Sequence, residues 1–593
     1  MDDPRAEYER RLAARRARIA ALDRVNLLIS NSRLVLAAAG FTLLWLAFVS
    51  RAVSPAWPIA IGVAFGVLAV VHAQQLNRFE RAQAAERVYE RGLDRLHDRW
   101  AGAGRDGAAF TADHLYAEDL DLFGRGSLFE RLNTTRTEAG ETMLAAWLGA
   151  PAPPGEVLAR QQAIDELRPL LDFREDIAVL ASESPVGRTG LLAKWAQASP
   201  TRFPRVLPFF LAALAAVTVA VTVANYTDVV PPGLLLPWIA VTVGIASIWR
   251  RPFSHVLHAI DTPDRDLGLV SELLARLESQ HFSSPRLVAL HDALMTAGVP
   301  PSARIARLRS LVSWLDSTHN LMFAPFAYVL LVRQQLAIAI ARWHEAYGPA
   351  IADWLRAIGE AEAFVALSAY AYERPDDPFP TLAENGALFE AEALAHPLLP
   401  QTTAVRNDIC LAGDGPQVIV LSGSNMSGKS TFLRTIGVNV VLALAGAPVA
   451  ARHLRLTPLV LGATLHIEDS LQAGHSRFYA EILRIRAIVD TARGATPLLF
   501  LLDEILHGTN SYDRRVGAEG IVRALVGYGA IGLITTHDLA LAELPATLGS
   551  KAVNMHFEDR LERGQMIFDY RLRPGVVEHS NALALMRAVG LDV

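Results

Sequence analysis

The pattern of hydrophobic and polar positions along the chain contains four long apolar runs, arranged as two pairs. Residues 34–50 and 56–73 form the first pair, residues 206–224 and 233–249 form the second, and no run contains an Asp, Glu, Lys or Arg. A helix of 17 residues, the shortest of these lengths, is about 26 Å long, close to the roughly 30 Å hydrocarbon core of a bilayer. The runs therefore predict two membrane hairpins, and helices buried in a protein core are the alternative.

Arginines lie at the outer ends of both pairs. They precede the first and third runs and follow the second and fourth: Arg10, Arg11, Arg15, Arg16, Arg18, Arg33, Arg78, Arg81, Arg202, Arg205, Arg250 and Arg251. Because basic residues concentrate on the cytoplasmic side of membrane proteins, both hairpins are predicted to enter the membrane from the cytoplasm and to return to it. An even number of spans leaves the C-terminal half of the chain in the cytosol.

The pattern outside these runs changes near Phe389. Residues 252–376 alternate apolar and charged positions at helical spacing, whereas short β-branched runs separated by glycines and longer helices follow, as in a parallel α/β sheet. The apolar segment 320–343 is interrupted by Arg333; we interpret it as a helix buried in protein and leave open whether it enters the membrane. The predicted order is an arginine-rich cytoplasmic helix (1–33), transmembrane hairpin 1 (34–73), a linker helix (74–114), a first part of a helical core (115–205), transmembrane hairpin 2 (206–249), a second part of the core or lever (250–385) and an α/β domain (386–593).

Composition agrees with a membrane protein of a reducing compartment. Hydrophobic residues make up 51% of the chain and the mean hydropathy is +0.24, which argues against a purely soluble protein. The net charge of −5 provides no global basic field of the kind that favours nucleic-acid binding. The single cysteine, Cys410, excludes an intrachain disulfide and a cysteine zinc site.

A glycine-rich loop joins a predicted strand, residues 418–421, to a predicted helix. Its sequence, GSNMSGKS, fits the pattern G-x-x-x-x-G-K-[ST] of phosphate-binding loops. In such loops the glycines let backbone N–H groups point at phosphate oxygens, the lysine reaches the β- and γ-phosphates, and the last hydroxyl ligates Mg²⁺. The predicted site for ATP and Mg²⁺ comprises Gly423, Ser424, Asn425, Met426, Ser427, Gly428, Lys429, Ser430 and Thr431.

Other candidate site residues follow predicted strands or precede a helix. Asp503 and Glu504 end the buried strand 498–502, at the sheet edge where ligands bind; we predict Asp503 as a second Mg²⁺ ligand and Glu504 as the general base. His537 ends a third strand, where it can orient the γ-phosphate, so Lys429, Glu504 and His537 are the candidate catalytic residues. Ser476 precedes a helix and is expected to contact ATP across a homodimer that closes over the nucleotide.

These motifs together resemble those of the MutS family of ATPases. The family's GPNMxGKSTxLR corresponds to GSNMSGKSTFLR, its LLDEIxxGTSTYDG to LLDEILHGTNSYDR, its GxSTFxxE to GHSRFYAE and its THxxxL to THDLAL. Similar sequence extends over roughly residues 115–593, apart from the second apolar pair. The resemblance implies a multidomain fold: α-helical membrane hairpins, an all-α MutS-like core or lever domain, and a C-terminal α/β P-loop ATPase domain of the ABC type.

The chain also departs from the family pattern. The family's mismatch-recognition and connector domains have no counterpart, because the arginine-rich helix and the first apolar pair take their place. The resemblance implies nucleotide binding by Asn407, but the aromatic residue that stacks on adenine in many members is Ala404 here. Arg477 replaces the threonine of STF, and residues 506–508 read LHG where the family has GRG.

Two functions are compatible with these observations. The first is a multi-pass protein of the inner (cytoplasmic) membrane whose cytosolic Mg²⁺-dependent ATPase domain dimerises, hydrolyses ATP and moves helical levers, with mismatched or branched DNA as the partner that the resemblance implies. The alternative is an ATP-driven membrane-remodelling or signalling protein that acts on a protein or lipid. Arginines between residues 78 and 99 alternate with acidic residues, which is typical of a solvated helix rather than of a DNA-binding face.

Overall fold

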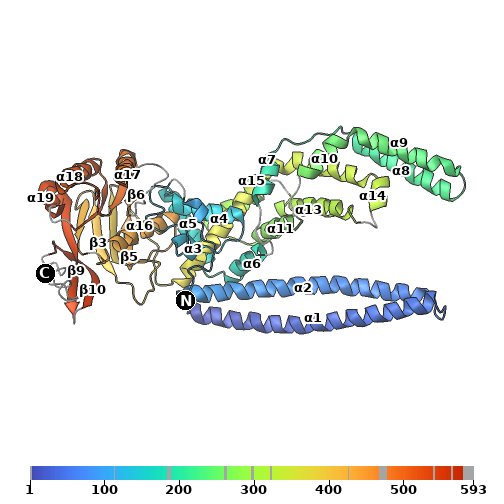
Figure 1. The fold of residues 1–593 in the computed structure, drawn as a ribbon, viewed down its shortest axis with the longest axis horizontal. Helices are drawn as coiled ribbons and strands as arrows, with labels where there is room; N and C mark the ends of the chain where they lie inside the picture. The colour runs from blue at the N-terminus through green and yellow to red at the C-terminus, as the bar shows by residue number, and fades with distance from the viewer. Residues whose placement is uncertain are drawn as a thin grey trace.

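The computed structural model describes residues 3–111, 114–182, 189–259, 264–295, 299–320, 324–424, 426–465, 477–537, 541–562 and 565–577. Two β-sheets lie at one end of an elongated molecule, and two helical hairpins extend from a helical body towards the other end (Figure 1). The α/β region therefore lies far from the tips of both hairpins.

The first hairpin consists of α1 (Pro4–Phe48) and α2 (Ala56–Leu96). The Asp3 side chain caps α1 by accepting a hydrogen bond from the Arg5 N–H (3.1 Å), and Pro4 occupies the first turn. The predicted boundaries at residues 33 and 73 fall inside continuous helices, because no proline or glycine separates the charged part from the apolar part of either helix. The arginine-rich segment and the apolar hairpin are thus two parts of one arm.

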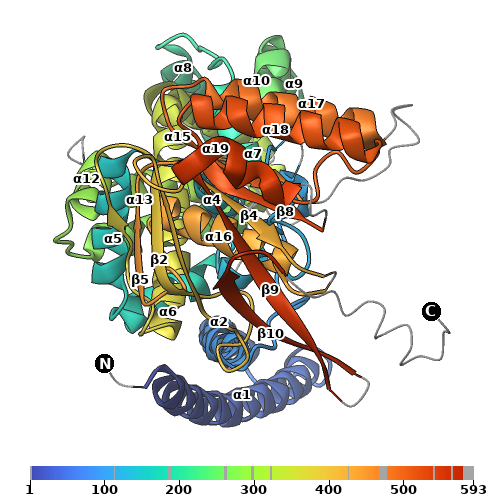
Figure 2. The ribbon, with the colours of Figure 1, turned by 90° about the vertical axis from the view of Figure 1, so that its left-hand side faces the viewer.

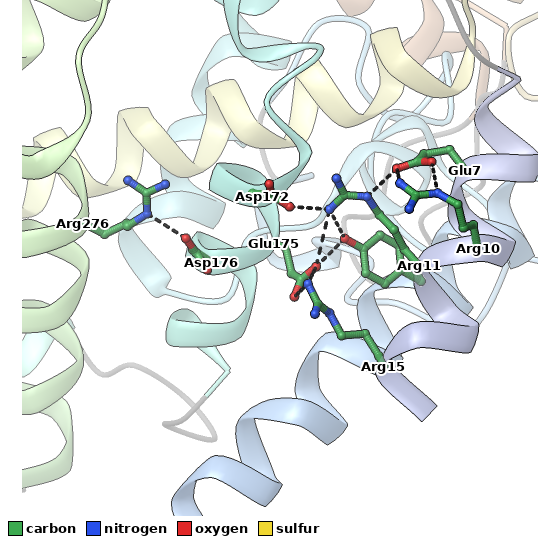
Figure 3. A network of polar contacts seen from close by, with 9 residues as sticks. Glu7, Arg10, Arg11, Arg15, Asp172, Glu175, Asp176 and Arg276 are labelled. Carbon is green, nitrogen blue, oxygen red and sulfur yellow. Dashed lines mark hydrogen bonds and ion pairs between the residues drawn. The ribbon is translucent and has the colours of Figure 1, made fainter. Parts of the chain in front are cut away.

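The charged base of this arm is bound to the helical body by ion pairs (Figure 3). The Arg11 guanidinium donates to Asp172 (2.5 Å) and to the Tyr89 hydroxyl (3.1 Å), and Arg15 donates to Glu175 (2.9 Å). Seen end-on, the arm lies below the helical body (Figure 2). Arg11 and Arg15 therefore attach the base of the arm to the helical body.

Three helices in the described part of the chain are long and apolar enough to cross a membrane: α1, α2 and α8 (Leu207–Tyr226). Apolar side chains of the first arm face outward, for example Leu34 (72% exposed) and Phe41 (76%). The fourth predicted run forms a shorter helix, α9 (Leu235–Ile248) of 14 residues, or about 21 Å, because its first residues form the 3-10 turn η2 (Pro232–Leu234). The tips of both hairpins point to the same end of the molecule (Figure 1).

The helical body surrounds one long helix, α15. Its other members are α3 (Leu128–Leu132), α4 (Glu138–Gly149), α5 (Pro154–Leu167), α6 (Leu171–Ala181), α7 (Thr189–Gln197), α10 (Arg250–Ala259), α11 (Asp264–Ser279), α12 (Pro285–Leu294), α13 (Pro301–Ser317) and α14 (Ala324–Val329). The 42-residue α15 (Val332–Glu373) runs from the hairpin side of the body to the sheets. Leu331 has a left-handed backbone (φ 54°), so the described part of segment 320–343 is divided between α14 and α15 and is not one membrane span.

The α/β region contains two sheets. The smaller has the order β1 (Thr381–Leu382), β5 (His453–Leu456), β2 (Leu388–Leu394), β3 (Asn407–Ala412). The larger has the order β10 (Gln565–Pro574), β9 (Ala552–Glu562), β4 (Val418–Ser422), β8 (Ile531–Thr536), β7 (Leu498–Leu502), β6 (Val460–Thr464), and all its described pairs are parallel except β10 with β9. Because β1 pairs with β5, the sheet region begins before the predicted boundary at residue 386.

Helices cover both faces of the larger sheet, and this explains the uninterrupted apolar strands. Ile419 and Leu421 of β4 face the core shared with α16 (Lys429–Ala445), whereas Val418 and Val420 face the core shared with α17 (Arg477–Ala492) and α18 (Ser511–Gly527). A short helix, α19 (Leu544–Leu548), precedes β9. Strands that are buried on both faces lose the alternation of polar and apolar residues.

The larger sheet joins the helical body around Asp119, whose side chain is fully buried. The Asp119 carboxylate accepts hydrogen bonds from the Leu465 N–H (2.7 Å) and from Arg484 of α17. The Arg434 guanidinium of α16 donates to the Asp119 carbonyl (2.9 Å). Helix α16, which follows the glycine-rich loop, and helix α17 are thus both bound to Asp119 of the helical body.

Candidate functional site

A cleft of about 910 Å³ opens at the carboxyl ends of β4, β7 and β8. Parallel strands bring the loops that follow them to one sheet edge, so residues far apart in the sequence meet there. The predicted site residues that line the cleft are Asn407, Met426, Gly428, Lys429, Ser430, Thr431, Asp503 and Glu504. Asn425 and Ser476 lie outside the described residues.

The glycine-rich loop between β4 and α16 requires both of its glycines. Gly423 (φ 153°) and Gly428 (φ 99°) have backbone conformations that other residues rarely adopt. A Cβ at Gly428 would also lie 2.9 Å from the Tyr570 ring, and one at Gly423 would lie 2.7 Å from the Ser427 hydroxyl. The loop therefore has a fixed curvature in front of the first turn of α16.

Lys429 is folded back into this curve. Its ammonium group donates to the carbonyl oxygens of Gly423 and Ser424, both at 2.9 Å, and lies 3.8 Å from the Glu504 carboxylate. Burial lowers the pKa of Lys429, while the charges of Glu504 and Asp503 act in the opposite direction. A cation is thus held at the centre of the loop.

Two hydroxyl groups of the loop, Ser424 Oγ and Ser427 Oγ, are buried and have no hydrogen-bond partner among the described residues. A buried polar atom without a partner is costly and calls for a ligand or water. Ser430 and Asp503 both line the cleft next to this loop, and Asp503 accepts a hydrogen bond from the Thr535 hydroxyl. These two hydroxyls are available to bind an anion, and the Ser430 and Asp503 oxygens are the ligand type that Mg²⁺ prefers.

The turn after β7 is strained and held from two sides. Glu504 (φ 45°) and Leu506 (φ 58°) both have left-handed backbones. The Glu504 N–H donates to Thr535 Oγ1 (3.0 Å), and the Leu506 N–H donates to the buried carboxylate of Glu481 on α17. These contacts fix the Glu504 side chain between Lys429 and two imidazoles.

The two imidazoles belong to His507 and His537. His537 Nδ1 lies 3.3 Å from Glu504 Oε1, and His507 Nε2 lies 3.3 Å from Glu504 Oε2. His537 follows β8, the strand next to β7, so its predicted place at the sheet edge agrees with the structure. His507 comes from the turn after β7, three residues beyond Glu504.

Asn407 lies at the wall of the cleft and is bound to β10. Its side-chain amide donates to the Tyr570 carbonyl (3.0 Å), and its amide oxygen accepts from the Leu572 N–H (2.8 Å). A register shift in β10 between Phe568 and Leu572 gives Tyr570 a positive φ of 54°. Asn407 thereby holds Tyr570 at the mouth of the cleft, where it is 44% exposed.

The sequence did not identify several residues that line the cleft. Tyr570 lies more than 100 residues from the glycine-rich loop, and no local pattern marks a β-bulge in advance. His396 lines the opposite wall, where burial and the positive charge of Arg434 lower its pKa to about 4. The single signal available for His507 was the departure of LHG from the family's GRG.

Comparison with known proteins assigns a family to this region. The family model for MutS domain V matches residues 419–592, which includes the glycine-rich loop, the strained turn and both histidines.

The relatives found are bacterial proteins named DNA mismatch repair protein MutS. The chain is 31% identical over 205 residues to that of Dehalococcoides mccartyi, which covers 33% of the chain and 23% of the relative. It is 28% identical over 274 residues to that of Brevibacillus brevis (45% and 30%), and 30% identical over 321 residues to that of Rhodopirellula baltica (53% and 32%). The matched part therefore spans less than a third of each of these relatives.

Proposed function

Because the chain belongs to the MutS family through its C-terminal region, we propose that it is a membrane-anchored, Mg²⁺-dependent ATPase with a P-loop domain of the ABC type. The observation that carries the proposal is the convergence of Lys429, Asp503, Glu504 and His537 at one sheet edge beside a glycine-rich loop. These are the groups that phosphoryl transfer to water requires.

Binding of the triphosphate begins with the loop. Its backbone N–H groups and the Ser424 and Ser427 hydroxyls, which are buried without a partner among the described residues, receive the phosphate oxygens. The Lys429 ammonium exchanges the Gly423 and Ser424 carbonyls for the β- and γ-phosphates. Ser430 and Asp503 hold Mg²⁺, which supplies charge neutralisation at the phosphates.

Hydrolysis is assigned to the pair of residues opposite Lys429. Glu504 accepts a proton from the attacking water, because its carboxylate is already fixed by the strained turn and lies 3.8 Å from Lys429. His537, at 3.3 Å from the same carboxylate, orients the γ-phosphate.

The adenine ring requires an aromatic partner that Ala404 does not provide. We assign this role to Tyr570, whose ring lines the cleft next to Gly428 and whose backbone is held by Asn407. Asn407 then contributes to nucleotide binding by positioning Tyr570.

The proposed ATPase acts as a dimer of two copies of the chain. Ser476, which precedes α17, contacts the nucleotide of a second copy of the chain, so that ATP holds two protomers together. The signal reaches the helical body through Arg434 and Arg484, which both bind Asp119. Helix α15 then moves as a lever between the sheets and the hairpins.

The ATPase assignment is tested by Glu504→Gln. This variant should bind ATP with unchanged affinity and hydrolyse it at least about 100-fold more slowly, since a general base contributes roughly that much. Glu519→Gln is the matched control, because Glu519 lies on α18 and pairs with Arg523 (2.6 Å). Unchanged turnover in Glu504→Gln would contradict the assignment.

The partner on which the levers act is proposed to be DNA, mismatched or branched. A second candidate is a protein or lipid, and the ion pairs of α2 favour it: Arg81 pairs with Glu272 (2.5 Å) and Arg95 with Glu373 (2.5 Å), so these arginines are engaged within the protein. Hydrolysis by the detergent-solubilised chain should be measured with and without duplex, mismatched and branched DNA. Stimulation and binding that weakens steeply with salt support DNA; no binding at low salt supports the second candidate.

A further inference from the structure

We propose that Glu504, His507 and His537 form a binding site for a transition-metal ion of the Zn²⁺ type, distinct from the Mg²⁺ site, and that its occupation stops hydrolysis. The binding site stands on geometry alone, whereas its effect on hydrolysis rests on the proposed function.

The three side chains come together from two neighbouring strands. Glu504 and His507 lie on the turn after β7, and His537 follows β8, which pairs with β7 in parallel. One ligand atom from each residue lies within 4.8 Å of the other two. The parallel pairing of β7 and β8 therefore produces the cluster.

The spacing of these atoms suits a tetrahedral ion. Zn²⁺ binds imidazole nitrogen and carboxylate oxygen at about 2.0–2.2 Å, so neighbouring ligands of a tetrahedral centre lie about 3.3–3.5 Å apart. Each histidine nitrogen lies 3.3 Å from its own Glu504 oxygen, His537 Nδ1 from Oε1 and His507 Nε2 from Oε2. The imidazole rings are tilted by 56° with centroids 4.9 Å apart, which leaves room for an ion between them.

The chemistry of the ligands separates this site from the Mg²⁺ site. Two imidazoles and one carboxylate are a ligand set that favours zinc and similar ions, whereas Ser430 and Asp503 offer only oxygen atoms, which favour Mg²⁺. His507 (46% exposed) and His537 (44%) are open to solvent. An ion can enter from the cleft and keep a water molecule in its fourth position.

The proposed metal site gives a reason for the histidine at position 507. The family pattern has arginine at this place, a permanent cation that cannot ligate a metal, and the chain has a histidine three residues from the proposed general base. When a metal ion holds the Glu504 carboxylate, that carboxylate cannot accept a proton from water. The glycine-rich loop and Lys429 are not ligands, so ATP still binds.

The test begins with Zn²⁺ binding to the full chain in detergent, measured by calorimetry without nucleotide. The comparison is wild type, His507→Ala, and the control His453→Ala, because His453 is exposed on β5 away from the cleft. We expect His507→Ala to weaken the tightest Zn²⁺ site by about tenfold or more, and His453→Ala to leave it unchanged. Co²⁺ should give the visible absorption of a tetrahedral centre with wild type and His453→Ala, and not with His507→Ala. Equal Zn²⁺ binding by wild type and His507→Ala would overturn the site.

The second measurement is ATP hydrolysis with Zn²⁺ in the presence of excess Mg²⁺. Each protein is compared with its own rate in the absence of Zn²⁺: wild type and His453→Ala should lose activity when Zn²⁺ is added, whereas His507→Ala should keep the rate that it has without Zn²⁺. Equal inhibition of wild type and His507→Ala would overturn the regulatory role. If no variant hydrolyses ATP, the proposed function fails, and the calorimetry still decides whether the metal site exists.

Discussion

Glu504 illustrates how a single residue is prepared for a chemical role by its backbone. A left-handed conformation at a non-glycine residue costs on the order of 1–3 kcal/mol and persists only where the surroundings enforce it. Here the Thr535 hydroxyl and the Glu481 carboxylate enforce it through hydrogen bonds with the N–H groups of Glu504 and Leu506. The strained turn places the carboxylate between Lys429 and the two histidines.

Tyr570 provides a prediction at the same scale. Tyr570→Ala should weaken ATP binding about fivefold or more, because stacking of a base on an aromatic ring contributes roughly 1–3 kcal/mol. Tyr570→Phe keeps the ring and the packing against Gly428 and should bind ATP like wild type. Fluorescence titration with a labelled ATP analogue measures the ATP affinity of both variants. An equal loss of affinity in the two variants would mean that the hydroxyl of Tyr570, and not its ring, contributes to ATP binding.

The stability of the protein should depend on pH because of the buried carboxyl group of Glu362. Burial raises its pKa to about 7, despite hydrogen bonds from the N–H groups of Arg136 and Thr137. Between its ordinary value of 4.5 and about 7, the folded state binds more protons than the unfolded state, so the free energy of unfolding falls as the pH rises through this window, by up to about 3 kcal/mol.

The variant Glu362→Gln is an uncharged analogue of the protonated acid and should lose this part of the pH dependence. Thermal unfolding in detergent between about pH 5 and pH 8 measures it. Wild type and the control Glu519→Gln should become less stable relative to Glu362→Gln as the pH rises. Parallel curves for all three proteins would show that Glu362 does not titrate in this range.

At the scale of elements, one buried carboxylate joins the arm to helix α15. Glu373, at the end of α15, has a fully buried side chain that binds Arg95 of α2 (2.5 Å) and Arg131 of α3 (3.3 Å). Tyr8 of α1 stacks on Tyr372 next to it, with ring centroids 5.5 Å apart. Both helices of the arm therefore meet the C-terminal end of α15.

Glu373→Gln should destabilise the protein strongly, because removal of one partner of a buried ion pair costs about 3–5 kcal/mol. Asp353→Asn is the matched control on the same helix, since Asp353 and its partner Arg356 are both exposed, and exposed pairs contribute at most about 1 kcal/mol. Differential scanning of the two variants in detergent should show a clear loss of Tm for Glu373→Gln alone. Similar Tm values would exclude Glu373 as the anchor of the arm.

Elements with a strong local signal could be predicted from the sequence. Strand β7 has the predicted bounds and β4 extends one residue beyond them, because an uninterrupted apolar run of five residues in β7 and four in β4, followed by polar or turn residues, favours a buried strand. The membrane hairpins were predicted as separate units, yet α1 and α2 continue into the charged base. At each predicted boundary the residues change from apolar to charged, but no proline or glycine interrupts the helix. The sequence therefore contains nothing that would end the helix at that point.

Features that depend on distant contacts could not be predicted. The place of Tyr570 follows from a bulge in β10 and from the amide of Asn407 on β3. The clustering of His507 with His537 follows from the pairing of β7 with β8. The motifs themselves were informative because each position has a separate physical requirement, such as the left-handed glycines at 423 and 428.

At the scale of the whole molecule, the proposed chemistry and the apolar surface occupy opposite ends. The cleft lies on the sheets, and the exposed apolar parts of α1, α2 and α8 lie at the far ends of the hairpins (Figure 1). The proposed membrane-anchored ATPase requires this separation, because its nucleotide would be in water and its apolar helices in lipid.

The most direct test of a membrane-anchored ATPase measures both properties at once. Membranes from cells that produce the wild type or Glu504→Gln are washed with alkaline carbonate, which removes peripheral proteins, and ATP hydrolysis is compared in membranes and supernatant. The account predicts that wild-type membranes keep an activity that Glu504→Gln membranes lack, with equal protein in both. An activity found in the supernatant, or present equally in both membranes, would contradict it.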